Sequence, residues 1–273
     1  MNNFENTVGF ITGGAAGIGL GVAKALGEQG MTLVLADIEP QTLEATADDL
    51  RAQGIEVYTE VLDVADAEAY KAVAERTLAR HKTIHFLFNN AGVAAPSTAG
   101  ESTLEDWRWV VDVNLLAVAY GIEFFLPAMR ASGEQGYIIN TASMAGQMGM
   151  AGMGSYCATK FAVVGLSEAL EQELADSPIN VSVLCPAWVK TRIAESIRNH
   201  PNPSVSETIP DAAANIGKII ADEGISVDAL VERVLRGMAE NTFYLFTHGD
   251  FWPFLETRLQ RIRDDYAKVL PAG

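Results

Sequence analysis

The chain has 273 residues, of which 49% are hydrophobic, and a formal net charge of −16. This length and this hydrophobic fraction indicate a folded chain with a large core and exclude a disordered one. The negative charge argues against nucleic acid and against anionic membranes as partners, because both bind basic surfaces. We also find no signal peptide, and we expect no stretch apolar enough for long enough to span a bilayer.

Cys157 and Cys185 are the two cysteines, and no Cys/His cluster has the spacing of a metal site. We therefore expect no metal. Free thiols suit a reduced, cytoplasmic protein, and we interpret both residues as small buried hydrophobic side chains rather than as functional thiols.

Short β-rich runs alternate along the chain with patterns of helical period. The candidate strands are 7–12, 32–37, 56–63, 84–90, 136–143, 180–186 and 242–248. The candidate helices are 17–29, 40–53, 66–81, 103–131, 156–176 and 226–240. Several strands are continuous apolar runs, which is typical of strands covered on both faces. The pattern predicts an α/β fold: a single-domain doubly wound parallel sheet (Rossmann fold) of about seven strands over residues 1–273, with helices on both faces.

One segment, 187–225, is longer than an ordinary connection and contains three prolines. Long insertions of this kind often serve as binding loops. We predict that it is a lid over the substrate.

A glycine-rich turn, "TGGAAGIG" at 12–19, joins the first strand to the first helix. Glycines there let the backbone approach a phosphate, and the helix N-terminus adds unpaired N–H groups. Asp37 ends the second strand, 18 residues after Gly19, where a carboxylate can accept hydrogen bonds from ribose hydroxyls. Such a carboxylate would repel a 2′-phosphate, and Ala16 and Ile38 supply no cation nearby. We expect NAD rather than NADP; a solvated loop aspartate is the plainer alternative.

Tyr156 and Lys160 stand four residues apart in "SYCATK", so a helix would place them on one face. Pairs at this spacing are also common on helix surfaces. A free tyrosine has a pKa near ~10, and a neighbouring ammonium favours the phenolate. The pair is therefore a candidate for proton transfer at a hydroxyl, with the pKa of Tyr156 lowered by Lys160.

Taken together, these motifs resemble the short-chain dehydrogenase/reductase family. TGxxxGxG matches Thr12, Gly13, Gly17 and Gly19; NNAG matches 89–92; the catalytic Asn and Ser match Asn114 and Ser143; and YxxxK matches Tyr156 and Lys160. Tyr156 follows Ser143 by 13 residues, and the resemblance covers roughly 6–190 and the last strand.

The resemblance implies an NAD-dependent oxidoreductase that interconverts a secondary alcohol and a ketone by hydride transfer. Tyr156 would be the general acid/base, and Lys160 would also contact the nicotinamide ribose. Ser143 would hydrogen-bond the substrate oxygen, and Asn114 would hold a water that joins Lys160 to solvent. Asn89 would tie strands together.

The residues that would contact the cofactor are Gly13, Gly17, Ile18, Gly19, Asp37, Asp63, Val64, Asn90, Tyr156, Lys160, Val189 and Thr191. One departure from the family is Ala187 in "PAWVKT", where a glycine is usual. Alanine resists a positive φ, so the local backbone conformation is open to question.

Two other functions remain possible from the sequence: a non-catalytic nucleotide sensor or scaffold on the same fold, and a sugar-nucleotide epimerase or dehydratase. The first should have lost one of the four catalytic residues, and the second usually has TGxxGxxG and a longer C-terminal domain. All four residues are present, and the epimerase features are not.

Large apolar side chains mark the lid and the C-terminal segment: Trp188, Ile193, Ile197, Phe251, Trp252 and Phe254. They suggest an apolar or aromatic substrate, unless they serve the core or an oligomer interface. "TRIAESIRNHP" and "NTFYLFTH" are similar to segments of bacterial enzymes that oxidise benzylic alcohols in lignin β-aryl ethers. Family members pack the helices corresponding to 103–131 and 156–176 against symmetry mates, so a homo-oligomer, a dimer or tetramer, is expected.

Overall fold

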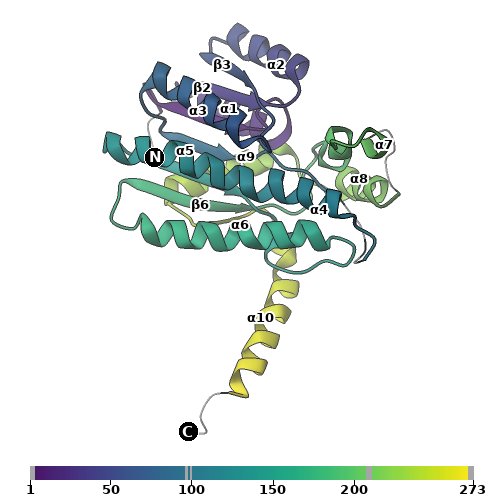
Figure 1. Cartoon of the computed structure of the whole chain (residues 1–273). Helices are drawn as coiled ribbons and strands as arrows, with labels where there is room; N and C mark the ends of the chain where they lie inside the picture. Colours follow the sequence, from purple (N-terminus) through teal and green to yellow (C-terminus); the bar gives the residue numbers. More distant parts are fainter. Residues whose placement is uncertain (1–3, 96–97, 99, 207–210, 270–273) are drawn as a thin grey trace.

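A seven-stranded sheet forms the centre of the computed structural model, which describes residues 4–95, 98, 100–206 and 211–269 (Figure 1). The strands lie in the order β3-β2-β1-β4-β5-β6-β7, and every pairing is parallel. Their bounds are β1 Val8–Thr12, β2 Thr32–Asp37, β3 Val57–Val61, β4 Phe86–Asn89, β5 Gly136–Thr141, β6 Ile179–Cys185 and β7 Tyr244–Phe246. The prediction of a doubly wound parallel sheet is confirmed.

Helices cover both faces of this sheet. One core joins α1, α2 and α9 to one face, and a second core joins α3, α4, α5 and α6 to the other. The helices are α1 Gly17–Gly27, α2 Pro40–Ala52, α3 Ala67–His81, α4 Leu104–Val111, α5 Ala117–Ser132, α6 Gly154–Glu173, α7 Pro203–Ser206, α8 Asp211–Glu223, α9 Val227–Glu240 and α10 Trp252–Ala267. Alternate residues of one strand enter different cores: Phe10 faces α5, whereas Ile11 faces α1.

Local sequence explains where several helices begin. The Asp66 carboxylate accepts hydrogen bonds from two backbone N–H groups of α3, at 3.0 Å each. Thr103 and Asp106 form a reciprocal capping box at the start of α4. These side chains satisfy backbone N–H donors that a helix start leaves unpaired. Both helices therefore begin within one residue of the predicted starts at 66 and 103.

The predicted helix over 103–131 is continuous, but one turn of it is a π-helix, η1 Asp112–Leu116, between α4 and α5. The expectation that no stretch has the length and hydropathy of a membrane span was wrong, because the helix Leu104–Ser132 has both. Half of its most apolar window is buried, and the helix packs against α3 and α6. Its hydropathy is that of a core helix.

The two ends of the segment 187–225, the predicted lid, lie side by side. Val189 and Ile225 form a parallel bridge, and the backbone hydrogen bonds Lys190 N to Ile225 O and Ile225 N to Trp188 O flank it at 2.9 and 3.0 Å. Between them lie the 3₁₀ segment η3 Ile193–Asn199, α7 and α8. Residues 207–210 of the predicted lid lie outside the described part of the chain.

The C-terminal helix α10 has an unusual position. It begins directly after the 3₁₀ turn η4 Gly249–Phe251 and extends away from the rest of the molecule (Figure 1). The sequence pattern did not predict this helix.

Candidate active site

A cavity of about 720 Å³ opens at the carboxyl ends of the parallel strands. The strand order reverses between β1 and β4, and in doubly wound sheets ligands bind at this switch point. The predicted site residues that line the cavity are Gly13, Gly17, Ile18, Asp37, Asp63, Val64, Asn90, Ser143, Tyr156, Lys160, Val189 and Thr191. Residues from across the chain thus meet in one space large enough for a ligand.

The glycine turn uses its glycines in two ways. Gly13 and Gly17 have φ of 64° and 56°, a region that side chains resist. A Cβ on Gly17 would lie 3.2 Å from Thr191 Cγ2, so the turn and the start of the lid are in close contact. Gly19 lies behind the turn, where a Cβ would be only 2.1 Å from the Gly13 carbonyl oxygen. The absence of a side chain at Gly19 lets α1 pack against the turn, and its contact with the cofactor stays a prediction.

Two asparagines hold the strand ends beside this turn. The Asn90 side chain donates to the Thr12 and Gly13 carbonyls at 3.0 and 3.3 Å. Asn89 Nδ2 donates to Asn140 Oδ1 at 2.8 Å and joins β4 to β5. The structural role predicted for Asn89 is confirmed.

Asp37 is fixed by its own backbone surroundings. Its carboxylate accepts hydrogen bonds from Ala15 N at 3.0 Å and from Glu39 N at 3.1 Å. Burial raises the pKa of Asp37 above its ordinary value, while the two N–H donors act in the opposite direction. One oxygen thus binds the glycine turn and the other binds the start of α2.

A cation that the local sequence did not reveal lies near Asp37. Arg198, on η3 of the lid, pairs with Glu39 through Nε–Oε1 and NH2–Oε1 distances of 2.8 and 2.6 Å. Burial favours the neutral form of Glu39, but the hydrogen bond and charge of Arg198 outweigh it and lower the pKa of Glu39. The fold thus adds a cation that the residues next to Asp37 in the sequence do not supply, and Glu39 neutralises it.

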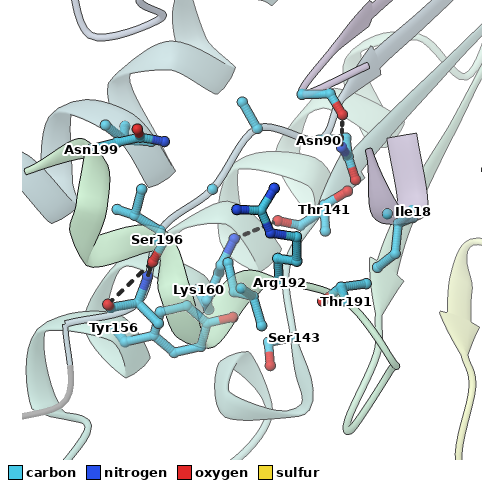
Figure 2. Close-up of a pocket in the computed structure, with 18 of the residues that line it drawn as sticks. Ile18, Asn90, Thr141, Ser143, Tyr156, Lys160, Thr191, Arg192, Ser196 and Asn199 are labelled. Carbon is cyan, nitrogen blue, oxygen red and sulfur yellow. Dashed lines mark hydrogen bonds between the residues drawn. The ribbon is translucent and has the colours of Figure 1, made fainter. Parts of the chain in front are cut away.

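Ser143, Tyr156 and Lys160 meet at the other end of the cavity (Figure 2). Ser143 follows β5, and Tyr156 and Lys160 share one face of α6. Lys160 Nζ donates to the Thr141 carbonyl at 2.9 Å and lies 5.5 Å from the centroid of the Tyr156 ring. The Ser143 hydroxyl donates to the Pro186 carbonyl at 3.3 Å and accepts a hydrogen bond from Ala145 N at 3.1 Å.

Burial dominates the protonation of this pair. It raises the pKa of Tyr156 to about 12, against a smaller lowering effect of the nearby Ser143 hydroxyl. It lowers the pKa of Lys160 to about 8. The pKa of Tyr156 is therefore raised and not lowered as expected, because burial is the dominant cause. The Lys160 ammonium itself donates to the Thr141 carbonyl.

Asn114 lies in the π-helical turn behind the cavity wall and is fully buried. Its side chain exchanges two hydrogen bonds with the Val93 backbone, at 2.8 and 2.9 Å. A Cβ on Gly92 would lie 3.3 Å from Asn114 Oδ1 and 3.6 Å from Lys160 Nζ, so the two side chains approach the same point. A π-turn often marks a functional position, and this one directs Asn114 inward.

The remaining predicted contacts line the walls. Asp63 accepts a hydrogen bond from Ala65 N at 3.0 Å, and Val64 is buried beside it. Ala187 causes no strain, because in the described chain the only non-glycine residues with positive φ are Asn6, Lys82 and Asn241.

Sequence reasoning found only part of the apolar wall. Trp188, Ile193 and Phe251 line the cavity as expected, whereas Ile197 is buried in the core and Trp252 and Phe254 are exposed on α10. The apolar lining residues it missed include Met144, Met150, Met153, Ile216 and Ile220. No local spacing marks them, because the three methionines come from the connection between β5 and α6 and the two isoleucines from α8, and only tertiary contacts bring these segments together. Within 4–95, 98, 100–206 and 211–269, no group of three His, Cys, Asp or Glu side chains is arranged to hold a metal.

Comparison with known proteins identifies the family. The pattern described as "short chain dehydrogenase" matches residues 7–202. The chain belongs to the short-chain dehydrogenase family. A "C alpha-dehydrogenase" of Sphingobium sp. (strain NBRC 103272 / SYK-6) is 34% identical over 98% of this chain and 89% of its own length. A "CLA biosynthesis dehydrogenase/reductase" of Lactiplantibacillus plantarum is 31% identical over 98% of this chain and 96% of its own.

Solved structures of the family agree in fold. A short-chain dehydrogenase/reductase from Burkholderia phymatum, in complex with NAD, is 34% identical and has a TM-score of 0.92, covering 100% of this chain and 99% of its own. The LigD apo form from Sphingobium sp. strain SYK-6 is 32% identical, with a TM-score of 0.82 over 99% and 100% of the two chains. The similarity to lignin Cα-dehydrogenases expected from the sequence is confirmed.

The residues present fit a nicotinamide dinucleotide. The glycine turn leaves room where side chains would intrude, a fixed carboxylate stands at one end, and Tyr156 and Lys160 stand at the other. Family members with either cofactor form are known, since another similar structure, 29% identical with a TM-score of 0.76, holds NADP at low occupancy.

Proposed function

We propose that this protein is an NAD-dependent oxidoreductase that interconverts a secondary alcohol and a ketone. The observation that carries this proposal is the meeting of Ser143, Tyr156 and Lys160 in the cavity that also contains the glycine turn. We further propose that it works in the cytoplasm as a homo-oligomer and that residues 1–273 form one domain with 187–225 as the lid.

Bound NAD would supply the hydride acceptor and a positively charged ring. In this mechanism, the Ser143 hydroxyl hydrogen-bonds the substrate oxygen and stabilises the charge that develops on it. Tyr156 accepts the hydroxyl proton in oxidation and returns it in reduction. With a pKa of about 12, Tyr156 holds its proton at neutral pH and is ready to donate it.

Lys160 and Asn114 support proton transfer at Tyr156. The buried Lys160 ammonium adds positive charge on the Tyr156 side of the cavity, which favours phenolate once the reaction demands it. Asn114 holds the Val93 backbone next to Lys160. We propose that a water held there connects Lys160 to solvent.

The proposed substrate is apolar or aromatic. At the substrate end, methionine, isoleucine and aromatic side chains dominate the wall, and such surfaces favour apolar ligands. The relative named C alpha-dehydrogenase supports a benzylic alcohol among these. A panel of benzylic alcohols and small aliphatic polyols with NAD, followed by nicotinamide absorbance, tests this choice, and turnover of polyols alone would overturn it.

The decisive test of the reaction is Tyr156→Phe. This change removes one hydroxyl, keeps the ring volume, and should preserve the fold. Turnover should fall by about 10²–10⁴-fold, because the proton-transfer group is lost, while calorimetric NAD binding stays close to that of the wild type.

Lys160→Ala serves as the contrasting variant. It should lose both turnover and NAD affinity, because Lys160 is assigned to Tyr156 and to the ribose. If Tyr156→Phe kept more than about a tenth of wild-type activity, well outside the range for lost proton transfer, the assignment would be wrong.

A further inference from the structure

The C-terminal helix α10 carries an apolar seam that the body of its own subunit leaves largely uncovered. Apolar side chains recur on it at alternating spacings of three and four residues. This seam consists of Trp252, Leu255, Leu259, Ile262, Tyr266 and Val269, just beyond the helix end. The spacing is that of the a and d positions of a heptad, which direct one narrow stripe toward another helix.

Most of the seam faces solvent. Leu259 and Ile262, at its centre, are 45% and 48% exposed, and Tyr266 is 65% exposed. Leu255, near the root, is buried against its own subunit, and Arg258 lies over the Phe161 ring of α6 with 5.1 Å between Cζ and the centroid. The root of α10 is therefore anchored, and the rest projects from the molecule (Figure 1).

The charges beside the seam identify the occupant. Positions e hold Glu256 and Arg263, and positions g hold Arg258 and Asp265. In an antiparallel pair of identical helices, e residues flank e residues and g residues flank g residues. A second α10 centred between Leu259 and Ile262 would then place Glu256 opposite the partner's Arg263 and Arg258 opposite the partner's Asp265.

A two-fold axis makes each of these contacts twice, as an isologous interface requires. A parallel pair would instead set Arg258 against the partner's Arg263, a repulsive combination. A lipid surface fits less well, because three acidic side chains share the helix with three cationic ones and the chain carries a net charge of −16.

We propose that α10 pairs antiparallel, seam against seam, with α10 of a second copy of this chain. In this pair Leu259 packs on the partner's Ile262, and each helix tip reaches the root of the other helix. The interface is separate from the surfaces of α5 and α6 expected to pack in family oligomers.

The first test breaks the seam of the full-length protein. Leu259→Glu/Ile262→Glu should weaken self-association at least tenfold in sedimentation velocity, with an unchanged far-UV spectrum and melting temperature of the subunit. The matched control, Thr257→Glu/Ala267→Glu, adds the same charge at exposed positions outside the seam and should associate like the wild type. Equal association of all three proteins overturns the proposal.

When all three proteins associate equally, vesicle binding identifies the occupant. If the wild type but not the seam variant then sediments with phosphatidylcholine/phosphatidylglycerol vesicles, a lipid surface is the occupant.

The second test reports the orientation of the two helices. Arg263→Glu should weaken association by placing two glutamates opposite each other, and Glu256→Arg/Arg263→Glu should restore it. Tighter association of Arg263→Glu alone would overturn the antiparallel arrangement, because a parallel pair gains from that change.

Discussion

The Asp37 carboxylate is held by two backbone N–H groups before any ligand arrives, so a ribose would meet an acceptor that is already oriented. We expect wild-type catalytic efficiency to favour NAD over NADP, because this carboxylate would repel a 2′-phosphate. Asp37→Ala should lose most of that preference. The measurement is kcat/KM with each cofactor, and a wild-type preference for NADP would contradict the assignment.

A second substitution, at Glu39, extends the same experiment. Glu39 pairs with Arg198, a cation that also lines the cavity. Asp37→Ala/Glu39→Gln should therefore use NADP better than Asp37→Ala alone, because Arg198 becomes available to a phosphate. Equal use of NADP by both variants would show that Arg198 does not reach the ligand.

Lys160 should link the stability of the protein to pH. Its pKa is about 8 in the folded protein and 10.5 in the unfolded reference. Below pH 8 both states hold the proton, and burial of the charge costs about 3 kcal/mol at 1.36 kcal/mol per pKa unit. Between pH 8 and 10.5 the unfolded state binds more protons, so the Lys160 contribution to the free energy of unfolding rises with pH.

Urea unfolding of the wild type and Lys160→Met at pH 7.5 and pH 10 measures this contribution. The difference between the two proteins is the relevant quantity, because burial raises the pKa values of Tyr156 and Cys185 and pulls stability the other way at high pH in both. The wild type should gain relative to Lys160→Met as pH rises. Lys190→Met, at an exposed lysine, is the control and should follow the wild type.

At the residue scale, the sequence predicted those site residues that lie in short motifs or at the ends of strands. The glycine turn, Asp37 and the Tyr156–Lys160 pair depend on positions a few residues apart, or on strand ends whose meeting follows from a parallel sheet. The Glu39–Arg198 pair joins residues 159 apart. The protonation of Tyr156 was also beyond the sequence, because it depends on burial rather than on spacing.

The same limit applies to whole elements. Buried strands such as β4 and β5 were found because strands covered on both faces carry nearly continuous apolar runs, here interrupted by Asn89 and Asn140. The edge strands β3 and β7 are shorter than the predicted 56–63 and 242–248, because an edge strand has only one neighbour to continue its ladder. The helices of the lid and α10 were missed, since their apolar faces meet the cavity or solvent instead of the sheet.

The lid is fastened to the rest of the molecule at several points. Ser196 Oγ accepts a hydrogen bond from Ala94 N at 2.9 Å, and the buried His200 ring packs on Trp109 with 4.7 Å between centroids. The Arg198–Glu39 pair joins η3 to the start of α2, and both residues line the cavity. Each attachment restrains a different part of η3 and the residues that follow it.

Breaking the last of these attachments should speed cofactor exchange. We expect Arg198→Ala to raise the NADH dissociation rate constant about three- to tenfold, consistent with a partly exposed ion pair worth about 1 kcal/mol. Stopped-flow displacement followed by NADH fluorescence measures the rate. In the wild type the rate should also rise with ionic strength, because salt screens the pair.

Two comparisons check the cause. Glu39→Ala should match Arg198→Ala, and the double variant should be no faster, because the interaction is lost only once. Lys190→Ala removes an exposed cation from the same segment and should release NADH at the wild-type rate. Unequal effects of Arg198→Ala and Glu39→Ala would assign the change to something other than their pairing.

At the scale of the whole molecule, the structure consists of a layered body and one projecting helix (Figure 1). The body has a buried apolar core on both faces of its sheet. The apolar side chains of α10, in contrast, are mostly exposed and would be buried only if another surface packed against them. Packing of α5 and α6 against symmetry mates stays a prediction from the family resemblance. A molecule of this kind can therefore be stable as a subunit and still depend on association for its most exposed part.

Phe251 lines the cavity, and the next residue, Trp252, begins α10. Any contact that holds α10 in place therefore acts on the residue that directly follows the cavity wall. An assay at nanomolar enzyme would dilute the pair apart and relax that wall, so specific activity should fall with dilution and recover on concentration. In Leu259→Glu/Ile262→Glu, specific activity should be low and independent of dilution, and a dilution curve that matched the wild type would uncouple the helix from catalysis.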